Sequence, residues 1–240
     1  MPIHLNSISI LAEKYPTTEH YPFSLSVLQQ TKQVFFNTPV TFFVGENGSG
    51  KSTLLEAIAI ACGIHIWRTG SNSRYRYNRY EATLHRYIRA NWSDGSVPGS
   101  FFGAQIFKDF AAILDEWATT DPAQLELFGG KSLITQSHGQ SLMSFFKSRY
   151  RLKGLYLLDE PETALSPRTQ LDLLKNLIDN SRAGHAQFII ATHSPILLAC
   201  PEATILTFDK KPLNAIDYKN TDHYIVYKDF MMNQEKYLQD

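Results

Sequence analysis

The stretch Gly45-Glu46-Asn47-Gly48-Ser49-Gly50-Lys51-Ser52 decides how the chain is interpreted, because it matches the pattern G-x-x-x-x-G-K-[ST]. Glycines let backbone N–H groups turn inward around phosphate oxygens, and the lysine of this pattern reaches the β- and γ-phosphates. The hydroxyl of Ser52 is placed to bind Mg²⁺. We therefore expect these eight residues, with Thr53, to form a phosphate-binding loop for a nucleotide.

The sequence around this loop predicts a strand before it and a helix after it. Residues 40–44 are almost continuously apolar, as in a strand buried on both faces. Leu54, Leu55, Ile58 and Ala61 share one face of a helix, and Gly63 is placed to end it. A helix N-terminus adds its dipole to anion binding, so the context supports the phosphate loop.

Further apolar runs and helical patterns indicate an α/β fold with a mainly parallel sheet. Strands are predicted at residues 8–11, 34–36, 155–158, 188–191 and 205–208. Helical stripes are formed by Phe107, Phe110, Ala111, Leu114 and Trp117, by Leu142, Phe145 and Phe146, and by Leu171, Leu174, Leu177 and Ile178. The last helix has Ser166 as N-cap and Pro167 at its first position, and a short helix is predicted at 230–238.

Two of the predicted strands are followed by polar residues that can take part in phosphoryl transfer. Asp159 and Glu160 follow the strand at 155–158. An Asp there can hold Mg²⁺, and a Glu one step further can polarise the attacking water in phosphoryl transfer. His193 follows the strand at 188–191, where α/β folds bind ligands, so we expect it to contact the γ-phosphate.

The middle of the chain is strongly basic, although the whole chain is neutral. Six arginines (Arg68, Arg74, Arg76, Arg79, Arg86 and Arg89) face one acid, Glu81, in residues 67–92. Arginine binds phosphates and tyrosine stacks on bases, so Arg74, Arg76 and Arg79 with their tyrosine neighbours suit a nucleic-acid surface. A solvated surface and a contact with an acidic protein are the alternatives.

Composition excludes several classes of protein. Twenty-three basic and twenty-three acidic residues exclude a nucleic-acid-coating protein, and 43% hydrophobic residues fit a globular chain. The two cysteines, Cys62 and Cys200, cannot form a four-cysteine zinc site. We find neither an apolar run long enough to span a bilayer nor a secretory signal, so we expect a cytoplasmic protein without membrane insertion.

Together the segments GENGSGKSTLLEAIA, LYLLDEPETALSP and ATHSPILLA resemble the ABC-type P-loop ATPases. They look most like the non-transporter branch, which includes SMC- and RecF-like heads and small bacterial ATPases of the AAA/ABC group. The resemblance implies ATP and Mg²⁺ as ligands, with Lys51, Glu160 and His193 in catalysis. It also implies a single domain over residues 1–240. Its nucleotide-binding core would be 1–63 and 151–240, with an antiparallel β part at the N-terminus and an inserted helical lobe at 64–150.

The resemblance also implies an ATP-dependent homodimer. The family's signature loop, which binds the partner's ATP, corresponds here to Ser137, Gly139 and Gln140, although His138 replaces a usual glycine. Gln105 resembles the glutamine that touches Mg²⁺ and couples the lobe to the nucleotide. The aromatic that stacks on adenine is expected before the phosphate loop, where Tyr15, Tyr21 and Phe23 are candidates.

Three functions are open on the sequence alone. The first is an ATP-hydrolysing, dimerising switch in a DNA-repair or defence-related complex, with an unidentified protein partner. The second is an ATP-binding subunit that energises a membrane transporter, although the order Asp-Glu-Pro-Glu differs from most transporter subunits. The third is an ATP-binding regulatory module with negligible turnover.

Overall fold

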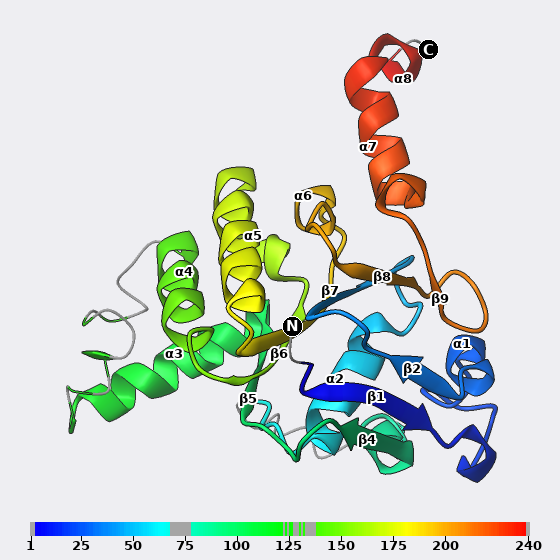
Figure 1. The fold of residues 1–240 in the computed structure, drawn as a ribbon, viewed down its shortest axis with the longest axis horizontal. Coiled ribbons are helices and arrows are strands. Elements are labelled where there is room, and N and C mark those ends of the chain that lie inside the picture. The colour runs from blue at the N-terminus through cyan, green and yellow to red at the C-terminus, as the bar shows by residue number, and fades with distance from the viewer. Residues whose placement is uncertain are drawn as a thin grey trace.

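The computed structural model describes residues 3–67, 78–121, 123, 125, 126, 130, 132 and 138–238. In this part of the chain the strands form two sheets (Figure 1). The larger has the order β5-β6-β7-β3-β8-β9, and the smaller has the order β2-β1-β4. The strands are β1 (Leu5–Ile10), β2 (Gln33–Phe35), β3 (Val40–Val44), β4 (Ile88–Trp92), β5 (Gly99–Gly103), β6 (Gly154–Asp159), β7 (Ala186–Ala191), β8 (Thr204–Thr207) and β9 (Asn214–Ala215).

Helices and short 3-10 turns connect and cover these strands. The main helices are α1 (Ser26–Gln30), α2 (Lys51–Ala61), α3 (Ala104–Ala118), α4 (His138–Arg149), α5 (Pro167–Arg182), α6 (Pro195–Leu198), α7 (Asp222–Met232) and α8 (Glu235–Leu238). The 3-10 turns are η1 (Ala12–Lys14), η2 (Leu84–Tyr87), η4 (Pro161–Ala164) and η5 (Tyr218–Asn220).

The larger sheet is parallel except for β9, which runs antiparallel to β8. Ala191, at the end of β7, is the register partner of Phe43 in β3 and of Asp159 in β6. The carboxyl ends of β3, β6 and β7 therefore lie side by side. The α/β class and the mainly parallel sheet are confirmed, and this shared edge collects the segments that the sequence singles out.

Both faces of the larger sheet are buried, which explains its continuously apolar strands. Along β7, Phe188 and Ile190 belong to one core with residues of α3, α4 and α5. Ile189 and Ala191 belong to a second core with residues of α2 and the small sheet. Strands at the centre of a parallel sheet need apolar side chains on both faces because helices cover both.

The small antiparallel sheet is joined to the larger one by a buried amide. Gln187 of β7 is fully buried. Its Oε1 accepts hydrogen bonds from the backbone N–H groups of His4 and Leu5, at 2.9 and 2.8 Å. Its Nε2 donates to the carbonyl of Leu5 at 2.9 Å. The amide thus satisfies three backbone groups at the start of β1 and sets the position of one sheet against the other.

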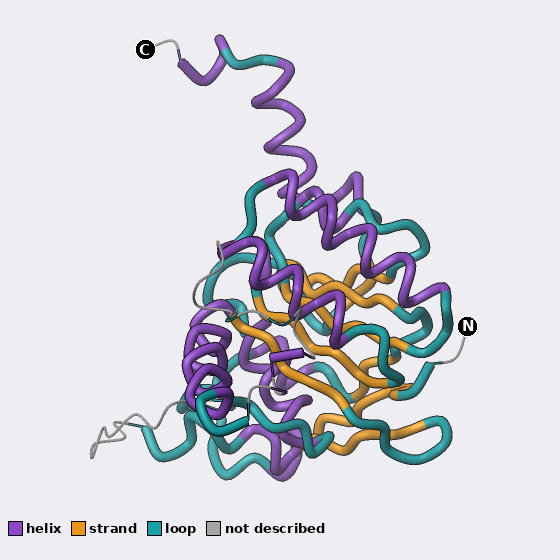
Figure 2. The backbone as a smooth tube through the Cα atoms, turned by 90° about the vertical axis from the view of Figure 1, so that its left-hand side faces the viewer, coloured by secondary structure: helices purple, strands orange, loops and turns teal. Residues whose placement is uncertain are grey.

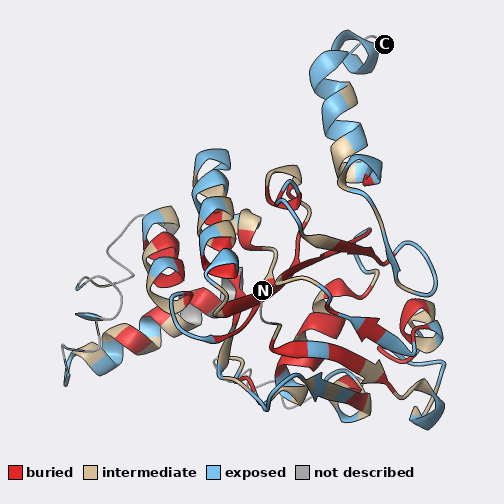
Figure 3. Ribbon diagram, viewed as in Figure 1, coloured by how far each residue is buried: buried red, intermediate tan, exposed pale blue. Residues whose placement is uncertain are grey.

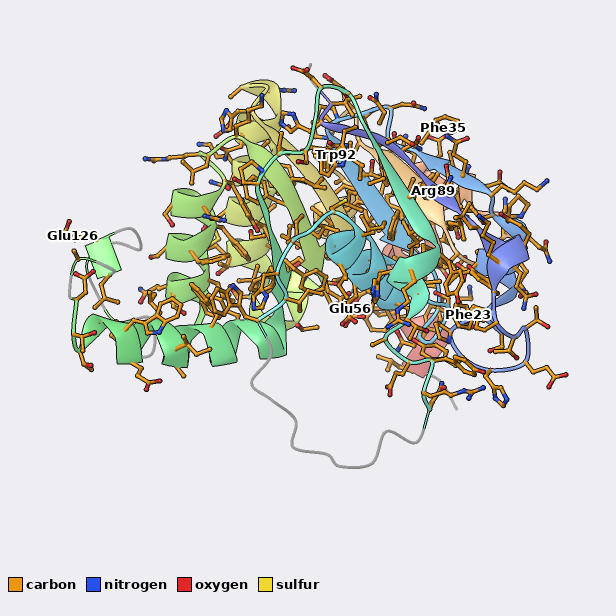
Figure 4. All side chains as sticks on the ribbon, turned by 90° about the horizontal axis from the view of Figure 1, so that it is seen from below. Phe23, Phe35, Glu56, Arg89, Trp92 and Glu126 are labelled. Carbon is orange, nitrogen blue, oxygen red and sulfur yellow. The ribbon has the colours of Figure 1, made fainter. Side chains whose placement is uncertain are left out.

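Helix α2 packs against the small-sheet side of the structure as well as against the larger sheet. Leu54 and Ile58 of α2 share a core with Ile8 of β1 and Ile189 of β7. Figure 4 shows α2, with Glu56 labelled, beside η2 and β4, with Arg89 and Trp92 labelled. The helix that begins at the phosphate loop is therefore held on two sides.

Residues 64–150, which the sequence assigns to a helical lobe, also contribute strands. β4 pairs with β1 in the small sheet, and β5 pairs with β6 at the edge of the larger sheet. The helices α3 and α4 follow β5, as the apolar stripes predict. The division into core and lobe stays a prediction, although two strands of this segment belong to the sheets.

Two details of the helix predictions are corrected. Leu171 is 56% exposed, whereas Leu173 and Leu177 are the buried leucines of α5. Leu171 precedes Leu173 by two positions, about 200° around a helix, so it points away from the core. The single helix expected at 230–238 is divided between two helices: α7 begins at Asp222 and ends at Met232, and α8 covers Glu235–Leu238.

The C-terminal helices α7 and α8 project from the body of the structure (Figures 1 and 2). Figure 3 shows most of α7 as exposed, and α7 has no buried residue. Within the described residues, no helix is long and apolar enough to cross a membrane.

Candidate functional site

The phosphate loop lies between β3 and α2 and adopts a conformation that depends on glycine. Gly45 has φ 142°, and a side chain there would lie 3.0 Å from Oδ1 of Asp209. Gly50 has φ 106°, and a side chain there would lie 2.8 Å from Leu25. L-residues rarely adopt such φ values, so the backbone requires glycine at both positions.

Lys51 is the cation at the centre of the loop. It is 4% exposed, and its Nζ donates hydrogen bonds of 2.8 and 2.9 Å to the carbonyls of Gly45 and Glu46. Burial lowers the pKa of Lys51, while the carboxylates of Glu160 and Asp209 act in the opposite direction. The ammonium group is therefore enclosed by the loop, where a phosphate oxygen can replace the backbone carbonyls.

The end of β6 meets the start of α2 through Ser52 and Asp159. The Ser52 hydroxyl donates to Oδ1 of Asp159 at 2.8 Å. Burial raises the pKa of Asp159 from 3.8 to about 6, and the Ser52 hydrogen bond partly offsets this effect. A hydroxyl and a carboxylate in contact at a phosphate loop are hard oxygen ligands of the kind that Mg²⁺ takes.

Glu160 lies one residue beyond Asp159 in an unusual backbone conformation. Its φ is 45° and its ψ is 54°, the left-handed region. Its N–H donates to the carbonyl of Ala191 at 2.9 Å, so the neighbouring strand holds this turn. The side chain is 38% exposed. Strained backbone of this kind concentrates at functional sites, where it directs a side chain.

His193 lies opposite this acidic turn. Its Nε2 is 3.6 Å from Oε1 of Glu160, and its Nδ1 is 2.7 Å from Nε2 of His223. Its backbone N–H donates to Oε1 of Glu162 at 2.6 Å. Burial lowers the pKa of His193, and the positive charge of Lys51 adds to this effect. The phosphate loop, the acidic turn and His193 thus form one site.

The site fits a nucleoside triphosphate with Mg²⁺. Among the described residues, three buried side-chain atoms here lack a hydrogen-bond partner: Ser49 Oγ, Glu162 Oε2 and His193 Nε2. Such atoms are satisfied when a polar ligand binds. The described residues contain no cluster of three or more His, Cys, Asp or Glu side chains suited to a metal ion. Ser52 and Asp159, which are in contact, would hold Mg²⁺ together with oxygens of phosphate and water.

The residues expected to bind ATP from the partner subunit are only partly described. Ser137 lies outside the described residues. Gly139 lies in the first turn of α4, where a side chain would lie 3.6 Å from the Thr169 hydroxyl, and Gln140 is exposed on the same turn. All three roles stay predictions.

The expected magnesium ligand Gln105 lies in the first turn of α3. Gly103, two residues before it, is the register partner of Asp159. The backbone of Gln105 is therefore near the acidic edge of the sheet, and its contact with Mg²⁺ stays a prediction.

Of the expected nucleic-acid-binding arginines, Arg74 and Arg76 lie outside the described residues. Arg79 is exposed, and its guanidinium lies 4.7 Å from the centre of the Tyr80 ring. The nucleic-acid interface stays a prediction.

The candidate adenine aromatics differ in exposure. Phe23 is fully buried and packs against Tyr15, with ring centres 4.6 Å apart. Tyr21 is 41% exposed, and its hydroxyl is hydrogen-bonded to that of Thr53 in α2. Tyr21 is the one of these three with both an open surface and a contact at the phosphate loop.

Three residues at the site carry no role in the sequence analysis. Asp209 accepts a hydrogen bond of 2.9 Å from the N–H of Glu46, and Glu162 holds the backbone of His193. His223 contacts the His193 ring. Glu162 stands in the segment that carries the resemblance, so its position was a usable signal. Asp209 and His223 belong to no motif, and only the fold brings them to the site.

Two family models match segments of the chain that contain these residues. A family model described as an AAA domain matches residues 24–109, which include the phosphate loop. A second, described as "AAA domain, putative AbiEii toxin, Type IV TA system", matches residues 143–199, which include Asp159, Glu160 and His193. No curated protein matches the chain.

Solved structures show the same fold. One is described as "an inward-facing conformation of a putative metal-chelate type ABC transporter"; it is 17% identical, with a TM-score of 0.51 over 93% of this chain and 88% of that chain. Another is cbiO1 from Clostridium perfringens, described as part of the ABC transporter complex cbiONQ; it is 20% identical, with a TM-score of 0.50 over 98% of each chain. With its phosphate loop, its two AAA-domain matches and this ABC-ATPase-like fold, the chain belongs to the P-loop ATPases.

Proposed function

We propose that the protein hydrolyses ATP and works as a nucleotide-driven dimerising switch. The observation that carries the proposal is the convergence of Lys51, Asp159, Glu160 and His193 at one edge of the sheet. Phosphoryl transfer requires positioning and charge stabilisation more than covalent chemistry from the protein, and these side chains provide both.

Each residue has a distinct task in this scheme. Lys51 and the loop amides bind the β- and γ-phosphates, and Glu160 accepts a hydrogen bond from the attacking water and orients it. His193 donates from Nε2 toward the γ-phosphate. Bound Mg²⁺, held by Ser52 and Asp159, would neutralise charge that develops on the phosphate oxygens. Gln105 adds a further ligand from the start of α3.

The dimer would complete the site from the opposite side. Ser137, Gly139 and Gln140 of one subunit would contact the γ-phosphate bound to the other, because the N-terminus of a helix such as α4 favours an anion. Hydrolysis would then remove the group that bridges the two subunits and allow them to separate. A protein or nucleic-acid partner would bind the basic segment that includes Arg74, Arg76 and Arg79. Separation of the two subunits would then move this partner.

The switch fits a defence-related complex better than a transporter. The family model over residues 143–199 covers the acidic turn and His193, and its description names a toxin of a toxin–antitoxin system. The transporter alternative rests on solved structures at 17–20% identity, which support the fold alone. Co-purification with a membrane subunit would revive the transporter alternative.

A turnover assay with three variants tests hydrolysis. Glu160→Gln should bind ATP normally and lower kcat by about 100-fold or more, and Lys51→Ala should weaken ATP binding by about 10–100-fold. Glu202→Gln, an exposed glutamate beside Arg182, is the control and should match wild type. Wild-type turnover in Glu160→Gln would remove Glu160 from its role, and ATP binding without any turnover would favour a regulatory module.

A further inference from the structure

His223 lies in the first turn of α7 and contacts the ring of His193. The two rings meet edge to face, with centres 4.9 Å apart and an interplanar angle of 61°. Nε2 of His223 and Nδ1 of His193 are 2.7 Å apart, which is hydrogen-bond distance.

The segment that carries His223 is fixed by its own contacts. Thr221 is 1% exposed, and its hydroxyl caps α7 by accepting a hydrogen bond of 3.3 Å from the N–H of Tyr224. The Tyr218 hydroxyl donates to the carbonyl of Pro195 at 3.0 Å. Pro195 is only two residues after His193, so the hydrogen bond from Tyr218 holds the segment before His223 against the segment after His193.

The surroundings of both rings favour the neutral imidazole. Burial lowers the pKa of His193 and of His223, and the positive charge of Lys51 lowers both further. A neutral imidazole has one N–H group and one bare nitrogen. The two nitrogens that face each other therefore share a single proton, with one ring as donor and the other as acceptor.

The position of Glu160 decides which ring donates. If His193 donated from Nδ1, its Nε2 would carry no proton. The lone pair of Nε2 would then face the negative carboxylate of Glu160 at 3.6 Å, which is unfavourable. If His223 donates instead, the proton of His193 is on Nε2, where it faces this carboxylate favourably. The second arrangement also leaves His193 with a donor on the side of the acidic turn.

We propose that His223 is a positioning residue, whose Nε2–H donates to Nδ1 of His193 and so keeps the proton of His193 on Nε2. The inference deepens the proposed function, on which its catalytic part rests, because a donor at this atom is what a γ-phosphate oxygen requires. It also means that one hydrogen bond, from His223 to His193, connects α7 to the nucleotide site. The partner of a histidine's second nitrogen commonly sets its tautomer.

Two substitutions separate donation from mere space filling. His223→Gln places an amide N–H close to the position of Nε2 and can still donate. His223→Glu places an acceptor there and should move the proton of His193 to Nδ1. His85→Glu is the matched control, because His85 is a partly exposed histidine whose Nδ1 lies 2.9 Å from the carbonyl of Ala82 in its own turn.

Long-range ¹H–¹⁵N spectra of the nucleotide-free protein report the tautomer of His193, assigned by comparison with His193→Gln. We expect an Nε2–H tautomer in wild type and His223→Gln, and an Nδ1–H tautomer in His223→Glu. In ATP turnover, His223→Glu should lower kcat by about tenfold or more and leave KM within about threefold of wild type. The kcat of His223→Gln should stay within about threefold of wild type.

An Nδ1–H tautomer in wild type would overturn the proposal, as would an unchanged tautomer in His223→Glu. An equal loss of kcat in His85→Glu would also overturn it, because added charge alone would then explain the effect. The tautomer is measured without nucleotide. A wild-type protein that does not hydrolyse ATP would therefore refute the proposed function while the spectra still decide the role of His223.

Discussion

The hydroxyl of Ser52 donates a hydrogen bond of 2.8 Å to Oδ1 of Asp159, a residue 107 positions later in the chain. This contact joins the first turn of α2 to the end of β6. It exists because β6 lies beside β7 and β7 beside β3 in the parallel sheet. The contact holds a hydroxyl and a carboxylate together in the nucleotide-free protein. Because the carboxylate is buried, its ionised form lowers the stability of the fold.

Replacing Asp159 by asparagine should stabilise the nucleotide-free protein at neutral and higher pH. The pKa of Asp159 is raised by burial to about 6 in the folded protein, so the native state binds its proton more tightly than the unfolded chain. The wild type therefore loses stability as the pH rises through about 6, and the asparagine does not. At pH 8 we expect the free energy of unfolding of Asp159→Asn to exceed that of wild type by about 1–2 kcal/mol. This difference should decrease toward pH 4.

Urea unfolding at pH 4, 6 and 8 measures this difference. Asp172→Asn, at an exposed position of α5, is the control and should show no such pH dependence. A constant difference between Asp159→Asn and wild type across this range would show that the carboxylate is not destabilised by burial. The same variant should bind Mg·ATP more weakly.

The amide of Gln187 should be important for the stability of the fold. Gln187→Leu leaves the N–H groups of His4 and Leu5 and the carbonyl of Leu5 without their buried partner. We expect a loss of about 3–5 kcal/mol in the free energy of unfolding, since each unsatisfied buried group costs about 1–3 kcal/mol. Gln30→Leu, at an exposed position of α1, should change stability by less than about 0.5 kcal/mol. Equal effects of the two substitutions in denaturant unfolding would show that the joint between the sheets does not depend on this amide.

Glu162 should act through the backbone of His193. Its Oε1 accepts the His193 N–H at 2.6 Å, and burial raises its pKa. Glu162→Gln keeps an acceptor at this position, so we expect kcat within about threefold of wild type. Glu162→Ala frees the turn and should lower kcat by about tenfold. Glu202→Ala is the surface control, and an unaffected rate in Glu162→Ala would show that His193 is held by other contacts.

The parts of the fold with strong local signals were predictable. β3, β6 and β7 are buried on both faces, so their apolar runs stand out in the sequence. β5 begins with Gly99 and Ser100, and β4 carries Arg89 and Asn91, so neither strand has a continuous apolar run. Their pairing with distant strands forms them, and a local pattern could not reveal it.

The candidate site divides in the same way. The phosphate loop, Asp159, Glu160 and His193 each follow a buried strand or precede a helix, so their neighbourhood could be inferred before the structure. Asp209 and His223 approach from segments without any motif, because β8 ends beside the loop and α7 begins beside His193. Contacts of this kind depend on how distant segments meet, which a single sequence does not state.

The mass of Glu160→Gln in solution, with and without Mg·ATP, tests the switch most directly. Blocked hydrolysis should hold the closed state, so light scattering should give about 27 kDa without nucleotide and about twice that with Mg·ATP. Lys51→Ala should remain at the lower mass under both conditions. An unchanged mass of Glu160→Gln, with ATP binding confirmed by calorimetry, would contradict the ATP-driven homodimer.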